Sequence, residues 1–260
     1  MGKFRRGYRL AGVSWRVIAA DPAILTVLFV GVLGSLVVSA GSFLAIFRRI
    51  PSGDDFRFPG YLVVVPVLWA GSVVSTYCKV VVSVMADRRL RGEEPAVADG
   101  MSVATSRLGR IAGWTALSIA VGLFLQVLAE RLKLAGVIAR QLLGLAWGLA
   151  TTFVIPVIAF EDVGVSESVR RSAALFRSKW GETVVAQGTI GGALVLVMLP
   201  LILLVGILCA ISLPLGIVVG VVVLSALVLI SGALDAVVRV ALYRYAIDGA
   251  VLGAFTVEDL

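Results

Sequence analysis

The chain has 260 residues, of which 60% are hydrophobic and 15% charged, and its mean hydropathy is +1.04. A soluble domain is about 45–50% apolar and about 25% charged, so this composition excludes an ordinary soluble fold and indicates a membrane protein. The sequence has no histidine, which excludes Ser-His-Asp triads and histidine-ligated zinc or haem. Its two isolated cysteines, Cys78 and Cys209, indicate neither a metal site nor a disulfide framework.

The N-terminal segment predicts an amphipathic helix that lies in the membrane interface, over residues 3–18. Aromatic side chains repeat on one face at helical spacing, and arginines lie between them. The predicted lipid-facing residues are Phe4, Tyr8 and Trp15, and the predicted contacts with anionic lipid are Arg5, Arg6 and Arg9. The uncharged run that follows, residues 22–47, is too long for the apolar region of a cleavable signal peptide and suits a membrane span.

Uncharged runs along the chain predict six membrane-spanning helices. A span needs about 20 apolar residues at 1.5 Å each. The last run, residues 183–234, has 52 residues without a charge, so it must fold back, and Pro214 places the turn between Gly206 and Pro214. The predicted spans cover residues 22–47, 58–85, 111–130, 138–160, 183–208 and 216–242.

The basic residues predict the orientation of these spans. With the N-terminus in the cytoplasm, 17 of the 23 Lys and Arg residues lie on the inner side and six on the outer side. Cytoplasmic loops of membrane proteins carry such an excess of Lys and Arg. We therefore expect both termini in the cytoplasm, and we interpret the net charge of +7 as topology and affinity for anionic lipid, not as nucleic-acid binding.

Two further interfacial helices are predicted on the inner side, over residues 97–110 and 165–180. The predicted lipid-facing residues are Leu108, Phe176 and Trp180, and the predicted anionic-lipid contacts are Arg107, Arg110, Arg170 and Arg177. Each interfacial helix precedes a pair of spans, which suggests a threefold repeat of helix, span and span. The motifs Gly144-x-x-x-Gly148 and Gly216-x-x-x-Gly220 predict close packing between helices of the chain, with a dimer face as the alternative.

The second half of the sequence resembles an uncharacterised family of prokaryotic six-span membrane proteins, a domain of unknown function. The resemblance begins near Asp99. It rests on Arg107-Leu-Gly-Arg110, Gly144-Leu-Ala-Trp147, Thr152-Phe-Val-Ile-Pro156, Glu167-Ser-Val-Arg170 and Ala241-Leu-Tyr243-Arg244. More distantly, the chain is similar to the membrane domain attached to some glycerophosphodiester phosphodiesterases. The phosphodiesterase barrel with its metal ligands is missing here, so the resemblance implies a topology and no catalytic residue.

Lys79, Asp235, Arg239 and Pro156 are the candidate functional residues within the spans. Asp235 and Arg239 are four residues apart and can pair on one helix face. Intramembrane charges suggest a functional site, with a structural salt bridge as the alternative. Lys79 is predicted at a similar depth and either contacts Asp235 or extends to the interface. Pro156 is predicted to kink the fourth span, either for packing or to line a substrate cavity.

The sequence thus predicts an all-α, polytopic membrane protein with a single transmembrane domain. We expect neither a catalytic centre nor a cofactor. The leading hypothesis is a non-enzymatic scaffold or accessory subunit that interacts with lipid or with a partner complex, including a second copy of the chain. The alternative is a small transporter or lipid-handling permease that uses the charged cluster of Lys79, Asp235 and Arg239.

Overall fold

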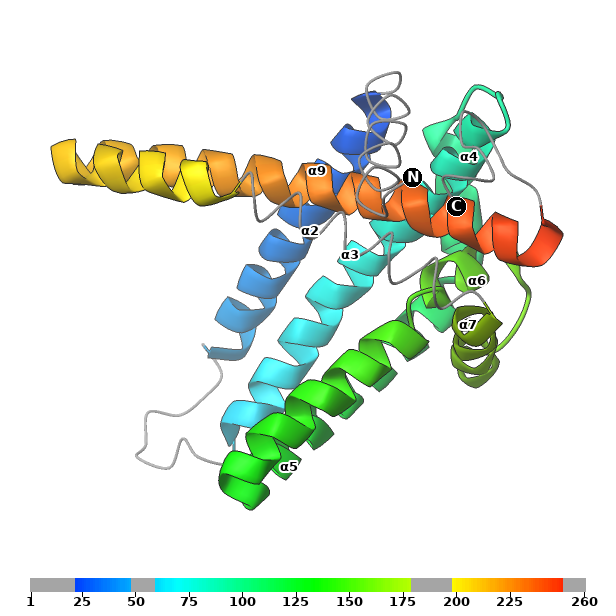
Figure 1. The fold of residues 1–260 in the computed structure, drawn as a ribbon, viewed down its shortest axis with the longest axis horizontal. Coiled ribbons are helices and arrows are strands. Elements are labelled where there is room, and N and C mark those ends of the chain that lie inside the picture. Colours follow the sequence, from blue (N-terminus) through cyan, green and yellow to red (C-terminus); the bar gives the residue numbers. More distant parts are fainter. Residues whose placement is uncertain (1–21, 48–58, 179–197, 250–260) are drawn as a thin grey trace, which may run out of the picture. The chain divides into compact units, whose positions relative to one another are not determined.

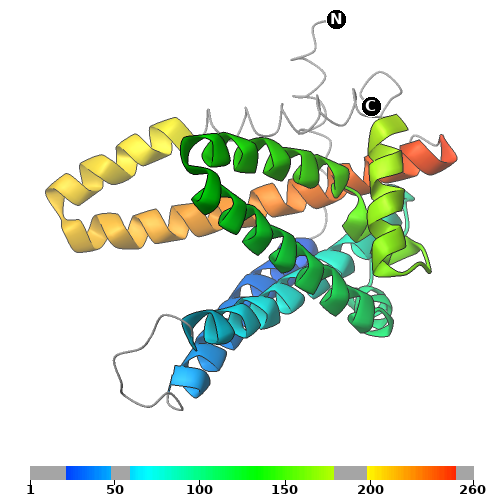
Figure 2. The same ribbon diagram turned by 90° about the horizontal axis from the view of Figure 1, so that it is seen from below.

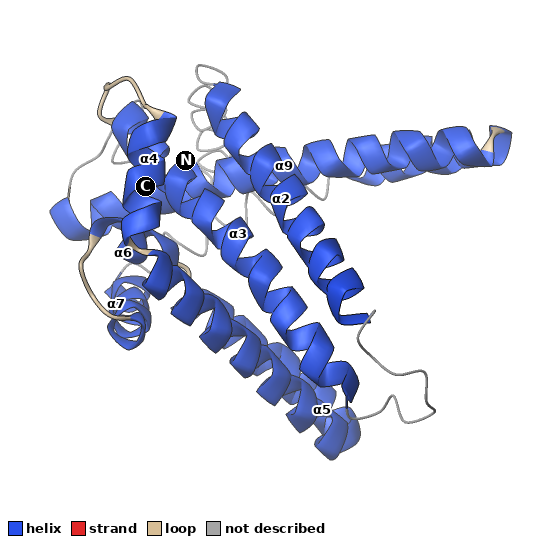
Figure 3. Ribbon diagram, turned by 180° about the vertical axis from the view of Figure 1, so that it is seen from behind, coloured by secondary structure: helices blue, strands red, loops and turns tan. Residues whose placement is uncertain are grey.

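The computed structural model describes residues 22–47, 59–178 and 198–249, and all secondary structure in these ranges is helical (Figures 1 and 3). In chain order the helices are α2 (Pro22–Phe47), α3 (Pro59–Leu90), α4 (Val97–Ser106), α5 (Leu108–Ala150), α6 (Val154–Phe160), α7 (Val165–Ser178), an apolar helix over Met198–Ile211, and α9 (Leu213–Asp248). The predicted interfacial helix over residues 3–18 lies outside the described residues.

The helices divide between two compact units. The first, which we call the α5 unit, holds residues 27–84 and 96–177, and the second, the α9 unit, holds residues 1–26, 85–95 and 178–260. The α5 unit therefore contains most of α2 and α3 together with α4 to α7. The α9 unit contains α9, the helix that precedes it and the last turns of α3.

Five segments are long and apolar enough to cross a membrane, which is compatible with a multi-pass membrane protein. They are Pro22–Ser42, Val65–Leu90, Leu108–Arg131, Gly136–Phe160 and Val223–Asp248. They correspond to five of the predicted spans, although α3 continues to Leu90, beyond the predicted end at residue 85. Residues 183–197 of the predicted fifth span lie outside the described ranges, and its remaining residues belong to the apolar helix Met198–Ile211. The count of six stays a prediction.

Helix α5 folds back on itself. Its 43 residues would extend about 65 Å in a straight helix, and Trp114 and Trp147 would lie about 50 Å apart. Their rings instead stack, with centroids 6.0 Å apart and planes 20° from parallel. Figure 2 shows the two limbs joined by a sharp turn at one end and diverging toward the other, and residues 132–135 lie between the two candidate spans. The third and fourth predicted spans are thus the two limbs of one hairpin.

Helices α2 and α3 approach closely along a row of small residues. An added Cβ at Gly31 would lie 2.7 Å from Cβ of Cys78, and one at Gly71 would collide with the side chain of Ser39. These pairs run in opposite directions along the two helices, so the helices are antiparallel. Small residues at such contacts are typical of membrane helices, because they let the backbones pack tightly where lipid provides no hydrophobic driving force.

Helix α4 and the start of α5 run antiparallel to α3 as one interrupted arm. Gly100 of α4 packs against Val81, and farther along the arm the indole of Trp69 donates a 3.0 Å hydrogen bond to the carbonyl of Ala112. The interruption is at Arg107, which separates α4 from α5. The helix predicted over residues 97–110 therefore ends at Ser106, four residues early, and Leu108 already belongs to α5.

The helix Met198–Ile211 and α9 form a hairpin with a tight turn at Ser212. An added Cβ at Gly220 would lie 3.1 Å from Val205, and Gly216 lies even closer to Cys209. The motif Gly216-x-x-x-Gly220 is therefore a packing seam within the chain, as predicted. The turn itself is shorter than the predicted Gly206–Pro214 segment, because the first helix continues to Ile211.

The prediction of a packing seam at Gly144-x-x-x-Gly148 is wrong for the described residues. A Cβ added at either glycine would have no described neighbour within 4 Å. The spacing alone could not distinguish the two motifs, because small residues permit close packing without requiring it.

Candidate functional site

A polar cleft lies in the α5 unit between α3 and the first limb of α5. From α3 it is lined by side chains one helical turn apart, at positions 72, 75, 76 and 79, so they share one face. The cleft has a volume of about 270 Å³. Its lining residues are Ser72, Ser75, Thr76, Lys79, Trp114, Thr115, Ser118 and Ile119. Five of these eight residues carry hydroxyl groups, within helices that are otherwise mostly apolar.

The hydroxyl of Ser118 is the most unusual polar atom of the cleft. Its oxygen is buried and has no hydrogen-bond partner among the described residues. The neighbouring Thr115 instead donates a 2.9 Å hydrogen bond to the carbonyl of Ala112, within its own helix. An unsatisfied buried hydroxyl is costly in a low-dielectric environment.

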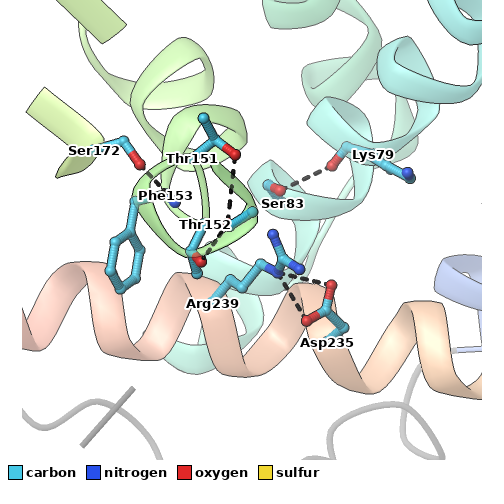
Figure 4. A network of polar contacts seen from close by, with 9 residues as sticks. Lys79, Ser83, Thr151, Thr152, Phe153, Ser172, Asp235 and Arg239 are labelled. Atoms are coloured by element: carbon cyan, nitrogen blue, oxygen red, sulfur yellow. Dashed lines mark hydrogen bonds and ion pairs between the residues drawn. The ribbon is translucent and has the colours of Figure 1, made fainter. Parts of the chain in front are cut away.

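Lys79 brings the only formal charge among the residues that line the cleft. Its side chain is exposed, and its backbone carbonyl accepts a 2.8 Å hydrogen bond from the hydroxyl of Ser83 (Figure 4). Lys79 lies 11 residues before the end of α3, about 16 Å along the helix axis. The sequence predicted Lys79 as a site residue but not the hydroxyl row beside it, although Ser72, Ser75 and Thr76 lie at the spacing of one helix face.

In the α9 unit, Asp235 and Arg239 pair along α9. Nε of Arg239 donates a 2.7 Å hydrogen bond to the carboxylate of Asp235 (Figure 4). The four-residue spacing predicted this pair. The predicted contact between Lys79 and Asp235 would join the two units, and it stays a prediction.

The fourth span is interrupted at residues 151–153, just before Pro156. Proline lacks an N–H group, and its ring clashes with the carbonyl four residues earlier, here that of Thr152. The predicted kink is an interruption by three turn residues: α5 ends at Ala150, and the short helix α6 carries Pro156 in its first turn. The hydroxyls of Thr151 and Thr152 donate to the carbonyls one turn earlier in α5, at 2.7 and 3.1 Å.

Ser172 of α7 fills this break. Its hydroxyl accepts a 3.0 Å hydrogen bond from the N–H of Phe153 (Figure 4). It also donates a 2.7 Å hydrogen bond to the carbonyl of Ala150. A continuous helix would have satisfied both backbone groups itself. Because a hydroxyl both accepts and donates, one serine replaces the two missing partners. Sequence reasoning missed this contact, since nothing in the local pattern pairs residue 172 with residues 150 and 153.

Three arginines contact Glu161 and Asp162, the two acidic residues that follow α6. Arg107 donates to the backbone carbonyl of Glu161, Arg110 forms an ion pair with Asp162, and Arg171 lies 3.3 Å from the carboxylate of Glu161. These contacts join the junction of α4 and α5 to the loop between α6 and α7. Arg107 and Arg110 thus have partners within the protein, which the sequence did not predict, and their contact with anionic lipid stays a prediction.

The buried face of α7 consists of Ser168, Ser172 and Leu175, and the location of this helix in the membrane interface stays a prediction. The side chain of Arg170 is 79% exposed and pairs with Glu167 of its own helix, and Arg177 is also exposed. Phe176 is half-buried, and Leu108 is 43% exposed at the start of α5. The other predicted lipid contacts lie outside the described residues: Phe4, Arg5, Arg6, Tyr8, Arg9, Trp15 and Trp180.

A comparison with known families bears on all of these features. The model of a family of unknown function, DUF6159, matches residues 60–253. The chain belongs to this family. No curated protein and no solved structure matches it.

The matched region of the DUF6159 family contains the cleft, the break filled by Ser172 and the Asp235–Arg239 pair, and it begins well before the predicted start near Asp99. The recognition of a family of unknown function is therefore confirmed, and α2 lies outside the match. The more distant similarity to the membrane domain of glycerophosphodiester phosphodiesterases stays a prediction. Membership assigns no activity to any residue, so the site has to be interpreted from its own chemistry.

A second ionic cluster, in the α9 unit, was absent from the sequence-based prediction. Arg244 of α9 forms two parallel hydrogen bonds, 2.7 and 2.8 Å long, with the carboxylate of Asp87 at the end of α3. The Asp87 side chain is 9% exposed and that of Arg244 17%. Arg91 also pairs with Asp87, and Asp248 lies 3.7 Å from Arg244. This bidentate geometry fixes the end of α3 against α9, so we interpret the cluster as structural.

Proposed function

We propose that this protein is a small lipid-handling permease of the cell membrane, and that its ligand occupies the polar cleft between α3 and α5. The observation that carries the proposal is the cleft itself: five hydroxyl-bearing residues and Lys79 around about 270 Å³, between two helices long and apolar enough to span a membrane. Ionisable groups at membrane depth are costly and are typical of substrate pathways.

The interrupted fourth span supports the same proposal. Transporters commonly use broken helices, because the interruption frees backbone groups and gives the span a point at which to move. Here the break at residues 151–153 is bridged by the single side chain of Ser172. Such a bridge can open without breaking a run of helical hydrogen bonds.

The proposal includes the predicted orientation, with both termini in the cytoplasm and α7 at the inner leaflet. The exposed basic residues of α7, Arg170 and Arg177, support contact with anionic lipids on that side. The proposed protein is not an enzyme and uses no cofactor.

A non-enzymatic scaffold or accessory subunit is the second candidate function. It is favoured by the tightly packed α2–α3 hairpin and by the pairing of Asp235 with Arg239 and of Asp87 with Arg244. In a scaffold, these charges stabilise a rigid bundle that presents α7 to lipid or to a partner.

Lipid exchange in proteoliposomes tests the permease against the scaffold. The purified protein is reconstituted with a fluorescent phospholipid, and the transfer of this lipid between leaflets is followed by quenching from outside. We expect faster transfer with the wild type, and little transfer with Ser75→Leu or Ser118→Leu, which fill the cleft. Ala116→Leu adds similar volume to an exposed position of α5 outside the cleft lining and is the matched control.

Two results would contradict the permease. One is a wild type that transfers lipid no faster than empty liposomes, and the other is equal transfer by the cleft-filling variants and the control. The scaffold function would be supported if, in addition, the protein purifies from native membranes in mild detergent together with a defined partner protein.

A further inference from the structure

Three hydroxyls on the α3 wall of the cleft have no hydrogen-bond partner among the described residues. They are those of Ser72, Ser75 and Thr76. Other hydroxyls of these helices are paired: Ser83 of α3 and Thr115 of α5 each donate to a backbone carbonyl one turn earlier in their own helix. Polar groups in folded proteins are nearly always hydrogen-bonded, to protein or to ordered water. Three unpaired hydroxyls on one face of α3 therefore indicate a hydrogen-bonding occupant of the cleft.

Thr76 gives the strongest indication of the three. The residue is only 7% exposed, yet its unpaired hydroxyl, unlike that of Ser118, keeps surface that a ligand can reach. Because Thr76 lines the cleft, this surface is reached from the cleft. Ser72 precedes Ser75 by three residues and Thr76 by four, and such neighbours on a helix lie about 5–6 Å apart. One six-membered ring with its substituents spans such a distance.

The α5 wall of the cleft has a different character. It contributes Trp114 and Ile119, while the hydroxyl of Thr115 is already bonded to its own helix and that of Ser118 is fully enclosed. This wall therefore offers an aromatic and aliphatic surface. The ring of Trp114 stacks on that of Trp147 with centroids 6.0 Å apart. Trp147 thus covers one face of Trp114, so the other face and the ring edge are left to contact the cleft.

We infer that the cleft binds a cyclic polyol, a sugar or inositol ring, and that this ring is the headgroup of the lipid. The ring hydroxyls pair with the hydroxyls of α3, since each hydroxyl can both donate and accept a hydrogen bond. The C–H groups of the ring lie against Trp114, because the face of an aromatic ring is negative and attracts the positive ends of C–H bonds. This inference rests on the proposed function and names the class of its substrate.

The size and the lining of the cleft agree with one such ring. Sites for drug-sized ligands have volumes of about 300–1,000 Å³, and the cleft, at about 270 Å³, has room for a single ring rather than an oligosaccharide. No Asp or Glu lines the cleft among the described residues, so this lining provides no counter-ion for a cationic headgroup. A water cluster would also pair with the hydroxyls, but it would leave the surface of Trp114 and Ile119 in contact with water.

Lipid-binding titrations of the full-length protein in neutral detergent, read by native mass spectrometry, test the inference. The probes are phosphatidylinositol, whose headgroup is a ring of hydroxyls, and phosphatidylmethanol, whose headgroup has none. Both lipids carry one negative charge, so the charge of Lys79 acts on them alike. We expect phosphatidylinositol to bind the wild type at least tenfold more tightly than phosphatidylmethanol.

The double variant Ser75→Ala/Thr76→Val removes two hydroxyls from the cleft and should reduce this preference to about twofold or less. The double variant Thr26→Val/Ser106→Ala is the matched control, because it removes the same two groups from exposed positions outside the cleft lining. We expect the control to keep the preference for phosphatidylinositol. A preference that survives in the cleft variant would overturn the inference, as would an equal loss in the two double variants.

The aromatic wall is tested at Trp114. Trp114→Leu should reduce the preference about threefold, and Trp114→Phe, which keeps an aromatic face, should retain it. A preference that Trp114→Leu leaves unchanged would overturn the placement of the ring on this wall.

Thermal unfolding separates a binding role of the hydroxyls from a structural one. Ser75→Ala/Thr76→Val breaks no hydrogen bond among the described residues, so we expect its unfolding temperature without added lipid to equal that of the wild type. Saturating phosphatidylinositol should raise the unfolding temperature of the wild type and of the control, because a ligand stabilises the state that binds it, but not that of the cleft variant. An equal rise in all three proteins would contradict the inference.

A soluble competitor identifies the source of the ring. Free inositol carries the same hydroxyls without phosphate or acyl chains. If it leaves phosphatidylinositol binding unchanged at millimolar concentration, the ligand is the lipid; if it displaces phosphatidylinositol from the wild type, the cleft accepts the free polyol as well. Both results support the polyol site.

The inference and the proposed function can fail separately. A preference for phosphatidylinositol that depends on the α3 hydroxyls, without any transfer of lipid between leaflets, would sink the permease and leave the polyol site standing. A wild type that transfers lipid but binds the two probes equally would do the reverse, and would mean that the cleft holds only water.

Discussion

Replacement of Ser172 by alanine is the most direct test of the interrupted fourth span. The variant removes the acceptor for the buried N–H of Phe153 and the donor to the carbonyl of Ala150. A buried polar group left without a partner costs about 1–3 kcal/mol, whereas hydrogen bonds between membrane helices average about 0.6 kcal/mol and reach about 1.7. For the two bonds together we expect a loss of about 2 kcal/mol, or about thirtyfold in the unfolding equilibrium.

Ser168→Ala is the matched control for Ser172→Ala. Both serines are fully buried on the same face of α7, so both variants remove one buried oxygen. The hydroxyl of Ser168, however, donates to the carbonyl of Gly164, which also accepts the N–H of Ser168 itself. Its removal therefore leaves no group unsatisfied, and we expect a loss of about 0.5 kcal/mol or less. Unfolding in mixed detergent micelles gives both free energies, and hydrogen exchange at the Phe153 amide should accelerate only in Ser172→Ala. Equal losses in the two variants would refute the bridging role.

Three further predictions concern packing, charge and topology. Asp87→Ala leaves the largely buried Arg244 without its bidentate partner and should lower the free energy of unfolding by about 3 kcal/mol. Asp248→Ala, at the exposed end of the same cluster, should cost at most about 1 kcal/mol. A similar cost for both would show that the Asp87–Arg244 pair is not structural. Gly31→Ala places a methyl group 2.7 Å from Cβ of Cys78 and should destabilise the α2–α3 hairpin by about 1–3 kcal/mol. Gly41→Ala is the control: it has no described neighbour and should stabilise α2 by up to about 1 kcal/mol. Reporter proteins fused to either terminus should be active only as cytoplasmic fusions, and a periplasmic or extracellular signal from either end would contradict the predicted orientation.

The sequence was sufficient to predict the helices that its uncharged runs define. Helix α2 covers the whole of the predicted span over residues 22–47, because that run contains no charged residue. The end of α3 was predicted five residues early. Asp87, Arg88 and Arg89 looked like the start of a loop, but in the structure the helix continues through them to Leu90. Helix length in this region follows from the tertiary pairing of Asp87 with Arg244, 157 residues away.

The candidate site was predicted only in part, because it too depends on contacts between helices that are far apart in the sequence. Lys79 was recognisable because a charge within an apolar run is rare. The cleft around it requires α3 and α5 to place two sets of hydroxyls opposite one another, and hydroxyl residues are too common in membrane helices to stand out one by one. Ser172 shows the same limit: its role depends on a break in another helix. The proline that causes the break was visible in the sequence, but the side chain that fills it was not.

The distribution of acidic residues gives a physical reason to place the ligand at the cleft. Asp235 pairs with Arg239, Asp87 pairs with Arg244, and Glu161 and Asp162 pair with arginines at the α4–α5 junction. The described lining of the cleft, in contrast, combines a lysine with hydroxyls and no carboxylate. A lysine at that depth attracts anions from the membrane and repels cations. Introducing a carboxylate there, as Ser75→Asp, should therefore slow the transfer of an anionic phospholipid in the proteoliposome assay even with Lys79 intact, and transfer at the wild-type rate would mean that the charge of the cleft does not select its ligand.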